Sequence, residues 1–180
     1  RQFFWDKRYI KEKNCPVLLI YRLRNIARFN DMIRYWNTCA KKDGFSGIFI
    51  VSMDTWRDHV DKSRWVNASV DFEPNKSRGE VMHFANFLKP KKTGSFLWNR
   101  LAIRSLSYRK INKQMLQNPH GKNQFRTVFV DFDDSPRRLE RAVINRGSSP
   151  RNFGKYLKKA IGLSREEGNS YLFINAWNEW

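Results

Sequence analysis

Cysteine and histidine are scarce in this sequence, and their positions argue against a metal centre. The two cysteines are Cys15 and Cys39, and the three histidines are His59, His83 and His120. Zinc sites and disulfide frameworks use these residue types at short, regular spacings, which this sequence does not show. We therefore predict no metal site and no cofactor, and the low cysteine content indicates a reducing compartment.

The sequence also lacks long apolar runs and glycine-rich phosphate loops. No stretch approaches the roughly 20 apolar residues that cross a bilayer, and no charged-then-apolar leader precedes the first strand motif. No glycine-rich loop follows an expected strand, which removes the strongest sign of a nucleotide-binding open sheet. We expect a cytoplasmic protein, either free or peripheral at the inner membrane. Because the sequence starts at Arg1 and stops at Trp180, we also expect a piece of a longer polypeptide.

Acidic residues are outnumbered, since 35 Lys and Arg against 17 Asp and Glu give a net charge of +18. Such a balance favours a polyanionic partner, whether nucleic acid, anionic lipid or a phosphate-bearing substrate. The basic residues are spread along the chain, however, with brief concentrations at 7–13, 89–92 and 137–146. A solvated basic surface explains this spread equally well. No zinc-finger, RNA-binding or basic-zipper signature is present, so nucleic acid is the less favoured partner.

Short apolar runs alternate with helical periodicity along the chain. Hydrophobic residues make up 41% of the sequence and aromatic residues 15%, which is typical of a folded domain. The pattern predicts strands at 16–21, 47–51, 68–72, 125–132 and 171–180, and helices at 29–40 and 108–116 and from Pro150 onward, with Ser149 as N-cap. Strand and helix in alternation predict an α/β fold around a parallel sheet. Periodicity alone leaves an open sheet and a closed barrel as alternatives.

Polar and acidic side chains recur where the expected strands end, at Arg22, Asp54, Asp71, Asp133 and Glu179. In a (β/α) barrel the carboxyl ends of the strands hold the active site. Arg22 either holds an acidic substituent or neutralises a neighbouring aspartate. The strand-end positions make Asp71 and Tyr21 candidate substrate-binding residues.

The final strand carries the strongest candidate, Glu179. Alternation along a strand places it on one face with Asn175 and Trp177. A carboxylate on an apolar strand is costly to bury unless it is paired or lies at a solvent-reached end. A salt bridge to an arginine is the structural alternative, and the flanking Trp177, Asn178 and Trp180 favour a site instead.

Five segments together resemble, in order and spacing and over nearly the whole chain, the glycoside hydrolase family 99-like, WbsX-type domain of bacterial polysaccharide gene clusters. Two of them depart slightly from the family pattern, with Asp71 where glutamate is usual and Asp134 and Ser135 in the Asp-Asn-Thr-Pro-Arg turn. The segments are 6–11 with 16–22, Asp71-Phe-Glu-Pro74, Asp133-Asp-Ser-Pro-Arg137, Ser149-Pro150 and Asn175-Ala-Trp-Asn-Glu-Trp180.

The resemblance implies a partial (β/α)8 TIM-type barrel, with residues 1–180 as a fragment of one domain truncated at one or both ends. In related endo-acting mannosidases the residue corresponding to Glu179 looks like the base that deprotonates a sugar 2-hydroxyl. A general acid follows three residues later there, at a position beyond Trp180. Tryptophan faces suit the C–H surface of sugars, so Trp177 and Trp180 are the expected platforms and Asn178 a substrate contact.

The Asp133 segment admits two interpretations. Asp133 binds sugar hydroxyls, with Arg137 orienting it or contacting a phosphate, or Asp133 caps the following turn and pairs with Arg137 structurally. We expect Asp131 and Asp133 to share a strand face.

The resulting hypothesis is a carbohydrate-active enzyme of bacterial surface polysaccharide metabolism, including O-antigen and lipopolysaccharide, with hydrolysis and glycosyl transfer both open. Its substrate would be a carbohydrate, either free or lipid-linked and phosphate-bearing, with peripheral contact to anionic membrane as an added partner. The alternative hypothesis is a non-catalytic basic module that binds anionic polysaccharide or nucleic acid.

Overall fold

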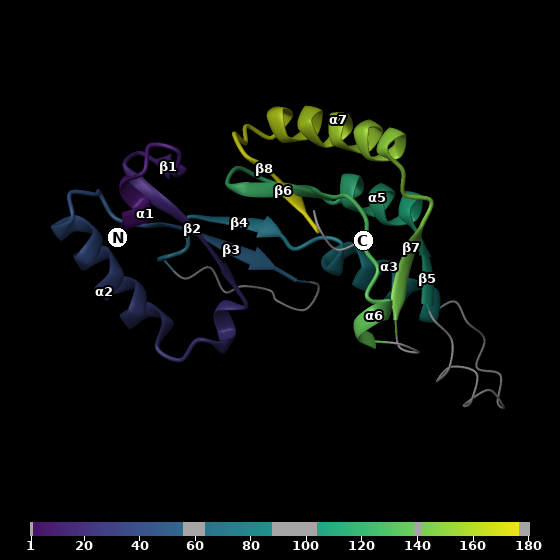
Figure 1. Cartoon of the computed structure of the whole chain (residues 1–180), viewed down its shortest axis with the longest axis horizontal. Coiled ribbons are helices and arrows are strands. Elements are labelled where there is room, and N and C mark those ends of the chain that lie inside the picture. Colours follow the sequence, from purple (N-terminus) through teal and green to yellow (C-terminus); the bar gives the residue numbers. More distant parts are fainter. Residues whose placement is uncertain (1, 56–63, 88–103, 139–141, 177–180) are drawn as a thin grey trace. The chain divides into compact units, whose positions relative to one another are not determined.

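The computed structural model describes residues 2–55, 64–87, 104–138 and 142–176, with the backbone alone for 83–87 and 104 (Figure 1). The chain divides into two compact units, Arg1–Asp71 and Phe72–Trp180. Each unit has its own cluster of buried apolar side chains. No helix among the described residues is long and apolar enough to span a bilayer.

The first unit is built on parallel strands. Val17 of β2 lies opposite Phe49 of β3, and Asp54 at the end of β3 lies opposite Asp71 of β4. A short antiparallel pairing of β1 with β2 precedes them. The elements are α1 Gln2–Trp5, β1 Lys11–Glu12, β2 Cys15–Tyr21, a 3-10 turn at Leu23–Asn25, α2 Phe29–Lys42, β3 Phe49–Asp54 and β4 Ala68–Asp71.

Helix α2 confirms the helix predicted from periodicity. Its apolar face delivers Ile33 and Ala40, both buried, to a core that includes Ile50 of β3. Trp36 packs against the same core, as its helical spacing predicts. The helix ends just before Gly44, whose φ of 87° lies in the left-handed region that glycine adopts without steric cost.

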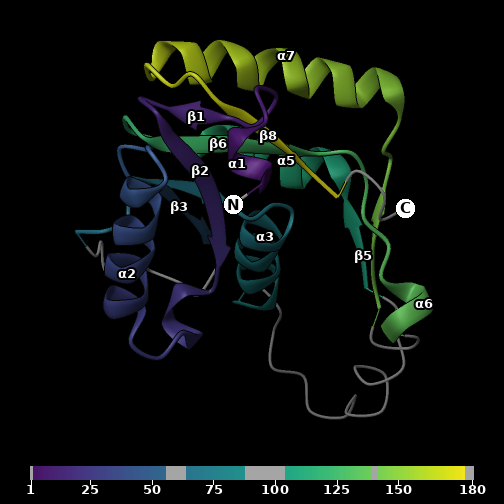
Figure 2. The ribbon, with the colours of Figure 1, turned by 60° about the vertical axis from the view of Figure 1, so that its left-hand side comes forward.

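The second unit pairs β6 with β8 and β5 with β7, both in parallel. Helix α7 runs along β6 and β8, as Figures 1 and 2 both show. The elements are α3 Asn75–Phe87, β5 Arg104–Ser107, α5 Tyr108–Gln117, β6 Gln124–Phe129, α6 Ser135–Arg138, β7 Val143–Arg146, α7 Pro150–Glu166 and β8 Leu172–Asn175.

The core of the second unit is centred on Tyr108, which packs with Ile111, Met115 and Phe129. The Tyr108 hydroxyl donates to the Phe129 carbonyl at 2.9 Å, and the two rings meet edge-on with centroids 5.0 Å apart. Burial raises the pKa of Tyr108 to about 12. This phenol therefore stays a neutral hydrogen-bond donor and ties α5 to the end of β6.

The amino-terminal cap of α7 is as predicted. Ser149 accepts a hydrogen bond from the Asn152 N–H at 3.2 Å, and Pro150 occupies the first turn. The helix thus begins where a side-chain acceptor satisfies an otherwise unpaired backbone donor and proline costs no hydrogen bond.

Several boundaries differ from the prediction. Strand β6 ends at Phe129 instead of 132, and β8 ends at Asn175 because Ala176 has a φ of 50°, outside the extended region. The alternation argument that placed Glu179 on the face of Asn175 therefore stops at Ala176. Helix α3 and strands β5 and β7 were not predicted.

The α/β class is confirmed by the parallel strands and the helices that connect them. Closure into a (β/α)8 barrel stays a prediction. The basic segment 89–92 lies outside the described residues.

Candidate functional site

Three predicted strand-end residues of the first unit share one sheet edge. Tyr21 ends β2 and lies opposite Met53, while Asp54 and Asp71 end β3 and β4 and lie opposite each other. Since the carboxyl ends of parallel strands meet at one edge, the structure brings Tyr21, Asp54 and Asp71 onto neighbouring strands there.

The side chains at this edge differ in exposure. Asp71 is buried, whereas the Tyr21 ring is 41% exposed and lies 4.9 Å from the Arg22 guanidinium. Ser52 donates to Asp54 at 3.1 Å. Arg22 stacks on the aromatic ring and pairs with no aspartate in the described part of the chain, so the predicted neutralising role is not what its contacts show.

In the second unit, the end of β8 is fastened to the start of α3. Asn175, opposite Phe129 of β6, donates its side-chain amide to the Glu73 carbonyl. The Glu73 carboxylate is buried and accepts bonds from Ser77, at 2.6 Å from the hydroxyl and 3.0 Å from the N–H. Glu73 was noted only as part of a motif. A carboxylate followed four residues later by serine is a local signal for such a contact.

Asp133 lies where the turn before α6 needs an acceptor. Its carboxylate accepts the Ser135 N–H at 2.7 Å. Hydrogen bonding by Ser135, through its side chain and its backbone N–H, holds the pKa of Asp133 below its ordinary value. Among the described residues Arg137 makes no ion pair with Asp133, and the ion pair of this turn joins Arg138 to Asp134 at 3.2 Å. Asp133 therefore caps the following turn, as the structural interpretation predicted, but the predicted pairing with Arg137 is not among the contacts of the described residues.

Asp131 does not share a strand face with Asp133, because both follow the end of β6. Asp131 accepts from the Phe132 N–H at 2.8 Å and from the Ser148 hydroxyl. That part of the prediction was wrong, since the extended alternation ends at Phe129. The acidic residues after β6 are instead fixed one by one by local donors.

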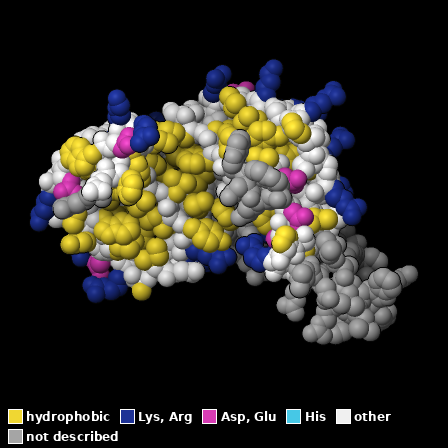
Figure 3. Space-filling view, in the orientation of Figure 1, with side chains coloured by type: hydrophobic (Ala, Val, Ile, Leu, Met, Phe, Trp, Pro, Cys, Tyr) yellow, Lys and Arg dark blue, Asp and Glu magenta, His cyan; other side chains and the backbone are white. Residues whose placement is uncertain are grey.

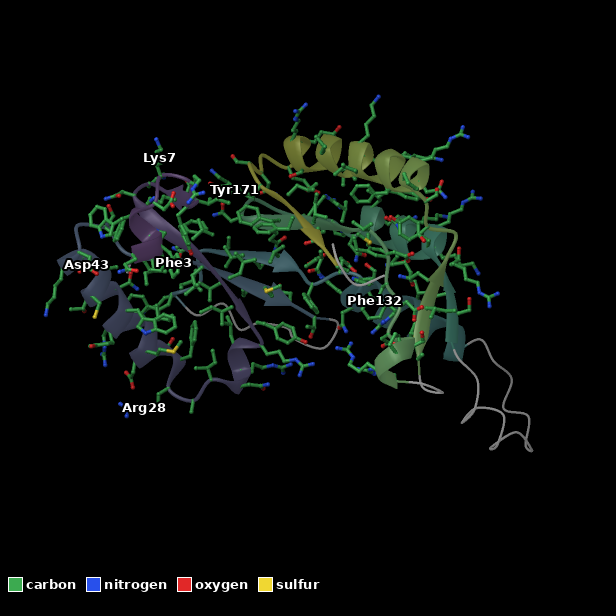
Figure 4. The ribbon with its side chains drawn as sticks, in the orientation of Figure 1. Phe3, Lys7, Arg28, Asp43, Phe132 and Tyr171 are labelled. Atoms are coloured by element: carbon green, nitrogen blue, oxygen red, sulfur yellow. The ribbon has the colours of Figure 1, made fainter. Side chains whose placement is uncertain are left out.

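Arg78, on α3, is a residue that the sequence did not single out. Its guanidinium lies 4.6 Å from the centre of the Phe132 ring, which Figure 4 labels between β6 and α6. Its Nη1 is buried and has no hydrogen-bond partner in the part of the chain that the structure describes. Burial lowers the pKa of Arg78, and the nearby Asp134 opposes that shift. Nothing in the sequence distinguishes this arginine among 35 Lys and Arg.

Asn145 of β7 approaches Phe132 through the backbone. Its N–H donates to the Phe132 carbonyl at 3.0 Å. Its side-chain nitrogen and its side-chain oxygen are both buried, and neither has a hydrogen-bond partner within the described ranges. Unpaired buried amide atoms are rare and costly, so this side chain is a candidate for contact with a ligand.

The predicted catalytic residue Glu179 and its neighbours Trp177, Asn178 and Trp180 lie outside the described residues. Their roles stay predictions. What the structure adds is the end of the strand that leads to them, held by the Asn175 side chain.

Charge on the visible face of each unit is dispersed. Figure 3 shows Lys and Arg side chains standing singly and not as a continuous patch. No group of three or more metal-ligating side chains occurs within the ranges that the structure describes.

Comparison with known proteins gives one family and two relatives. A family model described as glycosyltransferase WbsX matches residues 1–180. Proteins described as uncharacterized protein WxcX, from two strains of Xanthomonas campestris pv. campestris, are 23% identical over 184 residues, covering 99% of this chain. The chain spans about a quarter of the length of these curated relatives, 25% of each. No solved structure matches.

Proposed function

Since the chain belongs to the glycosyltransferase WbsX family, we propose that it is part of a carbohydrate-active enzyme that makes or trims a bacterial surface polysaccharide. The observation that carries the proposal is the match of the family model along the whole chain. Membership of this family indicates a role connected with carbohydrate. The reaction and the residues that perform it are what we propose.

The proposed chemistry is centred on Glu179. Breaking or making a glycosidic bond needs one group that protonates the leaving oxygen and another that assists at the opposite side of the ring. In the mannosidases that the sequence resembles, the base takes the proton of a sugar 2-hydroxyl. That oxygen then bonds to the anomeric carbon as the bond to the leaving oxygen breaks. We assign the base to Glu179.

The geometry at the end of β8 supports this assignment. The Asn175 side chain holds the strand end against Glu73 at the start of α3. Glu179 follows Asn175 by four residues, and an extended chain spans at most about 3.6 Å per residue, so covalent connection keeps it within roughly 14 Å. The anchored strand end therefore limits the space in which this carboxylate can lie.

The remaining candidates are proposed as substrate contacts. Trp177 and Trp180 would offer flat faces to sugar C–H surfaces, and Asn178 a hydrogen bond to a hydroxyl. Asp71 and Tyr21 lie at the carboxyl edge of the first unit, where barrel enzymes bind substrate.

Asp133 and Arg137 are placed differently by their contacts. Asp133 is already engaged by Ser135. Arg137 is exposed. We therefore propose that Arg137, in preference to Asp133, makes the sugar or phosphate contact in this turn.

The proposed architecture is one (β/α)8 barrel domain to which residues 1–180 contribute. Whether water or a second sugar accepts the glycosyl group decides between hydrolysis and transfer, and the same carboxylates serve both. The net charge of +18 supports a phosphate-bearing or lipid-linked substrate and peripheral contact with anionic lipid at the inner membrane.

The test is turnover by the intact protein carrying Glu179→Gln, with Glu166→Gln at the exposed end of α7 as the matched control. Free and lipid-linked oligosaccharides are offered, and products are followed by mass spectrometry. Removing a general base lowers rates by about 10²- to 10⁴-fold, so we expect a loss in this range with sugar binding retained. Turnover unchanged in Glu179→Gln and in the control would contradict the proposal.

A further inference from the structure

The guanidinium of Arg78 is a positive charge that the described residues leave without a hydrogen-bond or ion-pair partner. It makes no hydrogen bond or ion pair with any residue that the structure describes, and its Nη1 is buried. The side chain as a whole is half-buried and is held over the Phe132 ring at 4.6 Å. Stacking on an aromatic face fixes the plane of the guanidinium while leaving its N–H edges for another group.

The neighbouring carboxylate, Asp134, is engaged by other groups, although its Oδ2 accepts no hydrogen bond from the described residues. Asp134 is the carboxylate whose charge raises the pKa of Arg78. It pairs with Arg138 at 3.2 Å and accepts a hydrogen bond from the Val143 N–H. Arg137 and Arg138 add positive charge around the same guanidinium. Three arginine charges thus act around one carboxylate, that of Asp134. Keeping the Arg78 charge partly desolvated costs free energy unless an anion binds beside it.

Asn145 is bonded to the backbone of the same residue, Phe132, and carries a side-chain amide that is unsatisfied among the described residues. Its backbone N–H donates to the Phe132 carbonyl, while both polar atoms of its side chain are buried and bond to none of the residues that the structure describes. An amide supplies one donor group and one acceptor, the combination that a hydroxyl beside an acidic group requires.

We propose that Arg78 and Asn145, arranged about Phe132, form a subsite for an oxyanion carried by a sugar, either the carboxylate of a uronic acid or a sugar phosphate. The planar fork of arginine matches both groups in bidentate geometry, and lysine would not. Asn145 then bonds the anion or the hydroxyl next to it. That the natural ligand is a glycan rests on the proposed function, whereas the binding of the oxyanion does not require turnover.

The experiment is calorimetric titration of the intact protein at fixed ionic strength with glucuronic acid, glucose 1-phosphate, inorganic phosphate and neutral glucose. The variants are Arg78→Met, Arg78→Lys and Asn145→Ala, with Lys158→Met, which removes one charge from an exposed site on α7, as control. Circular dichroism establishes that each variant is folded. The carboxylate and phosphate arms identify which oxyanion is preferred.

We expect millimolar binding of at least one sugar acid, weakened about tenfold or more by either Arg78 variant and about threefold or more by Asn145→Ala. Lys158→Met should leave binding unchanged, and glucose should not respond to Arg78. Equal binding of the anions to wild type and Arg78→Met would overturn the subsite, as would failure of all three anions to bind at about 50 mM.

Turnover of Glu179→Gln, measured separately, distinguishes the two proposals. Arg78-dependent binding with turnover independent of Glu179 keeps the subsite and removes the proposed catalytic role. Glu179-dependent turnover with binding independent of Arg78 does the reverse.

Discussion

The two ends of the β6–β8 strand pair contain the same polar residue types in opposite states. Near the amino ends, Arg126 is almost fully buried, and its guanidinium bonds both carboxylate oxygens of Glu167 and the carbonyls of Met115 and Asn118. Near the carboxyl ends, Arg78 has an aromatic ring beneath it and no hydrogen-bond partner among the described residues.

Two asparagines repeat the contrast. The Asn169 side chain accepts the Asn123 N–H at 2.9 Å and donates to the carbonyls of Gly121 and Gln124 at 3.1 and 3.0 Å. Neither polar side-chain atom of Asn145 has a hydrogen-bond partner among the described residues. Arg126 and Asn169 at the amino ends are thus satisfied by the protein, whereas Arg78 and Asn145 keep unsatisfied polar atoms that a ligand can bind.

This difference follows a general property of parallel α/β folds. Residues at the amino ends of strands serve stability, and the carboxyl ends carry function. Proteins tolerate locally unfavourable polar groups at binding sites because other parts of the structure stabilise the fold. The contrast predicts that substitutions of one residue type will differ in effect between the two ends.

The largest effect is expected for Arg126→Met. The substitution would leave the largely buried Glu167 carboxylate without its counter-charge and two carbonyls without a donor. Removing one partner of a buried ion pair costs about 3–5 kcal/mol in the free energy of unfolding. Denaturant titration measures it, with Lys158→Met, expected within about 0.5 kcal/mol of wild type, as control. If Arg126→Met changed the free energy of unfolding as little as Lys158→Met does, the proposed difference between the amino and carboxyl ends of the strands would be wrong.

Asn169→Ala should follow, with a loss of about 2–3 kcal/mol, because it leaves one N–H and two carbonyls without their partner. Asn145→Ala is the matched substitution at the other end, and it should change the free energy of unfolding by less than about 1 kcal/mol since it removes no hydrogen bond of the side chain. The same denaturant titration compares them. Similar losses for both asparagines would show that Asn145 is structural.

Elements whose signals lie close together in the sequence were predicted, and elements that depend on contacts from elsewhere were not. Helices α2 and α7 were predicted because their apolar spacing lies within the helices and because their boundary signals, Gly44 after α2 and Ser149 with Pro150 at the start of α7, are adjacent in sequence. Helix α3 was missed because Gly79 interrupts it and because its start is fixed by Glu73 and Ser77. Glycine inside a helix and a contact from outside it both weaken the periodic pattern.

The candidate site divides in the same way. The strand-end positions of Tyr21 and Asp71 follow from strand boundaries, and the structure places them at one edge. Asp133 was assigned two roles because a capping aspartate and a ligand-binding aspartate look alike in sequence. Arg78 and Asn145 left no signal, since their unpaired state exists only after Phe132 is packed.

Arg78→Met is expected to leave the free energy of unfolding within about 1 kcal/mol of wild type or slightly above it. Methionine preserves contact with the Phe132 ring, and the substitution removes a partly desolvated charge that has no ion-pair partner among the described residues. Denaturant titration again measures the difference. A loss as large as that of Arg126→Met would mean that Arg78 is part of the structural framework.

The smallest effect is expected for Asp133→Asn, and it depends on pH. The folded-state pKa of Asp133 is below its ordinary value of 3.8 because of Ser135. Its charged form therefore contributes stability that is present above the unfolded pKa and is lost as pH falls through the lower folded pKa. Thermal unfolding should show a slightly lower Tm for the variant at pH 7 and no difference in strong acid. A difference that persists in acid would show that the carboxylate charge is not involved.

The most direct test of the account is hydrogen–deuterium exchange of the intact protein with and without bound sugar acid or oligosaccharide substrate. We predict protection in the segments at the carboxyl ends, 72–78, 130–138, 143–148 and 172–180, and no change in 118–126 and 164–171 at the amino ends. Protection confined to the amino-end segments would contradict the assignment of sugar binding to the carboxyl ends of β6 and β8.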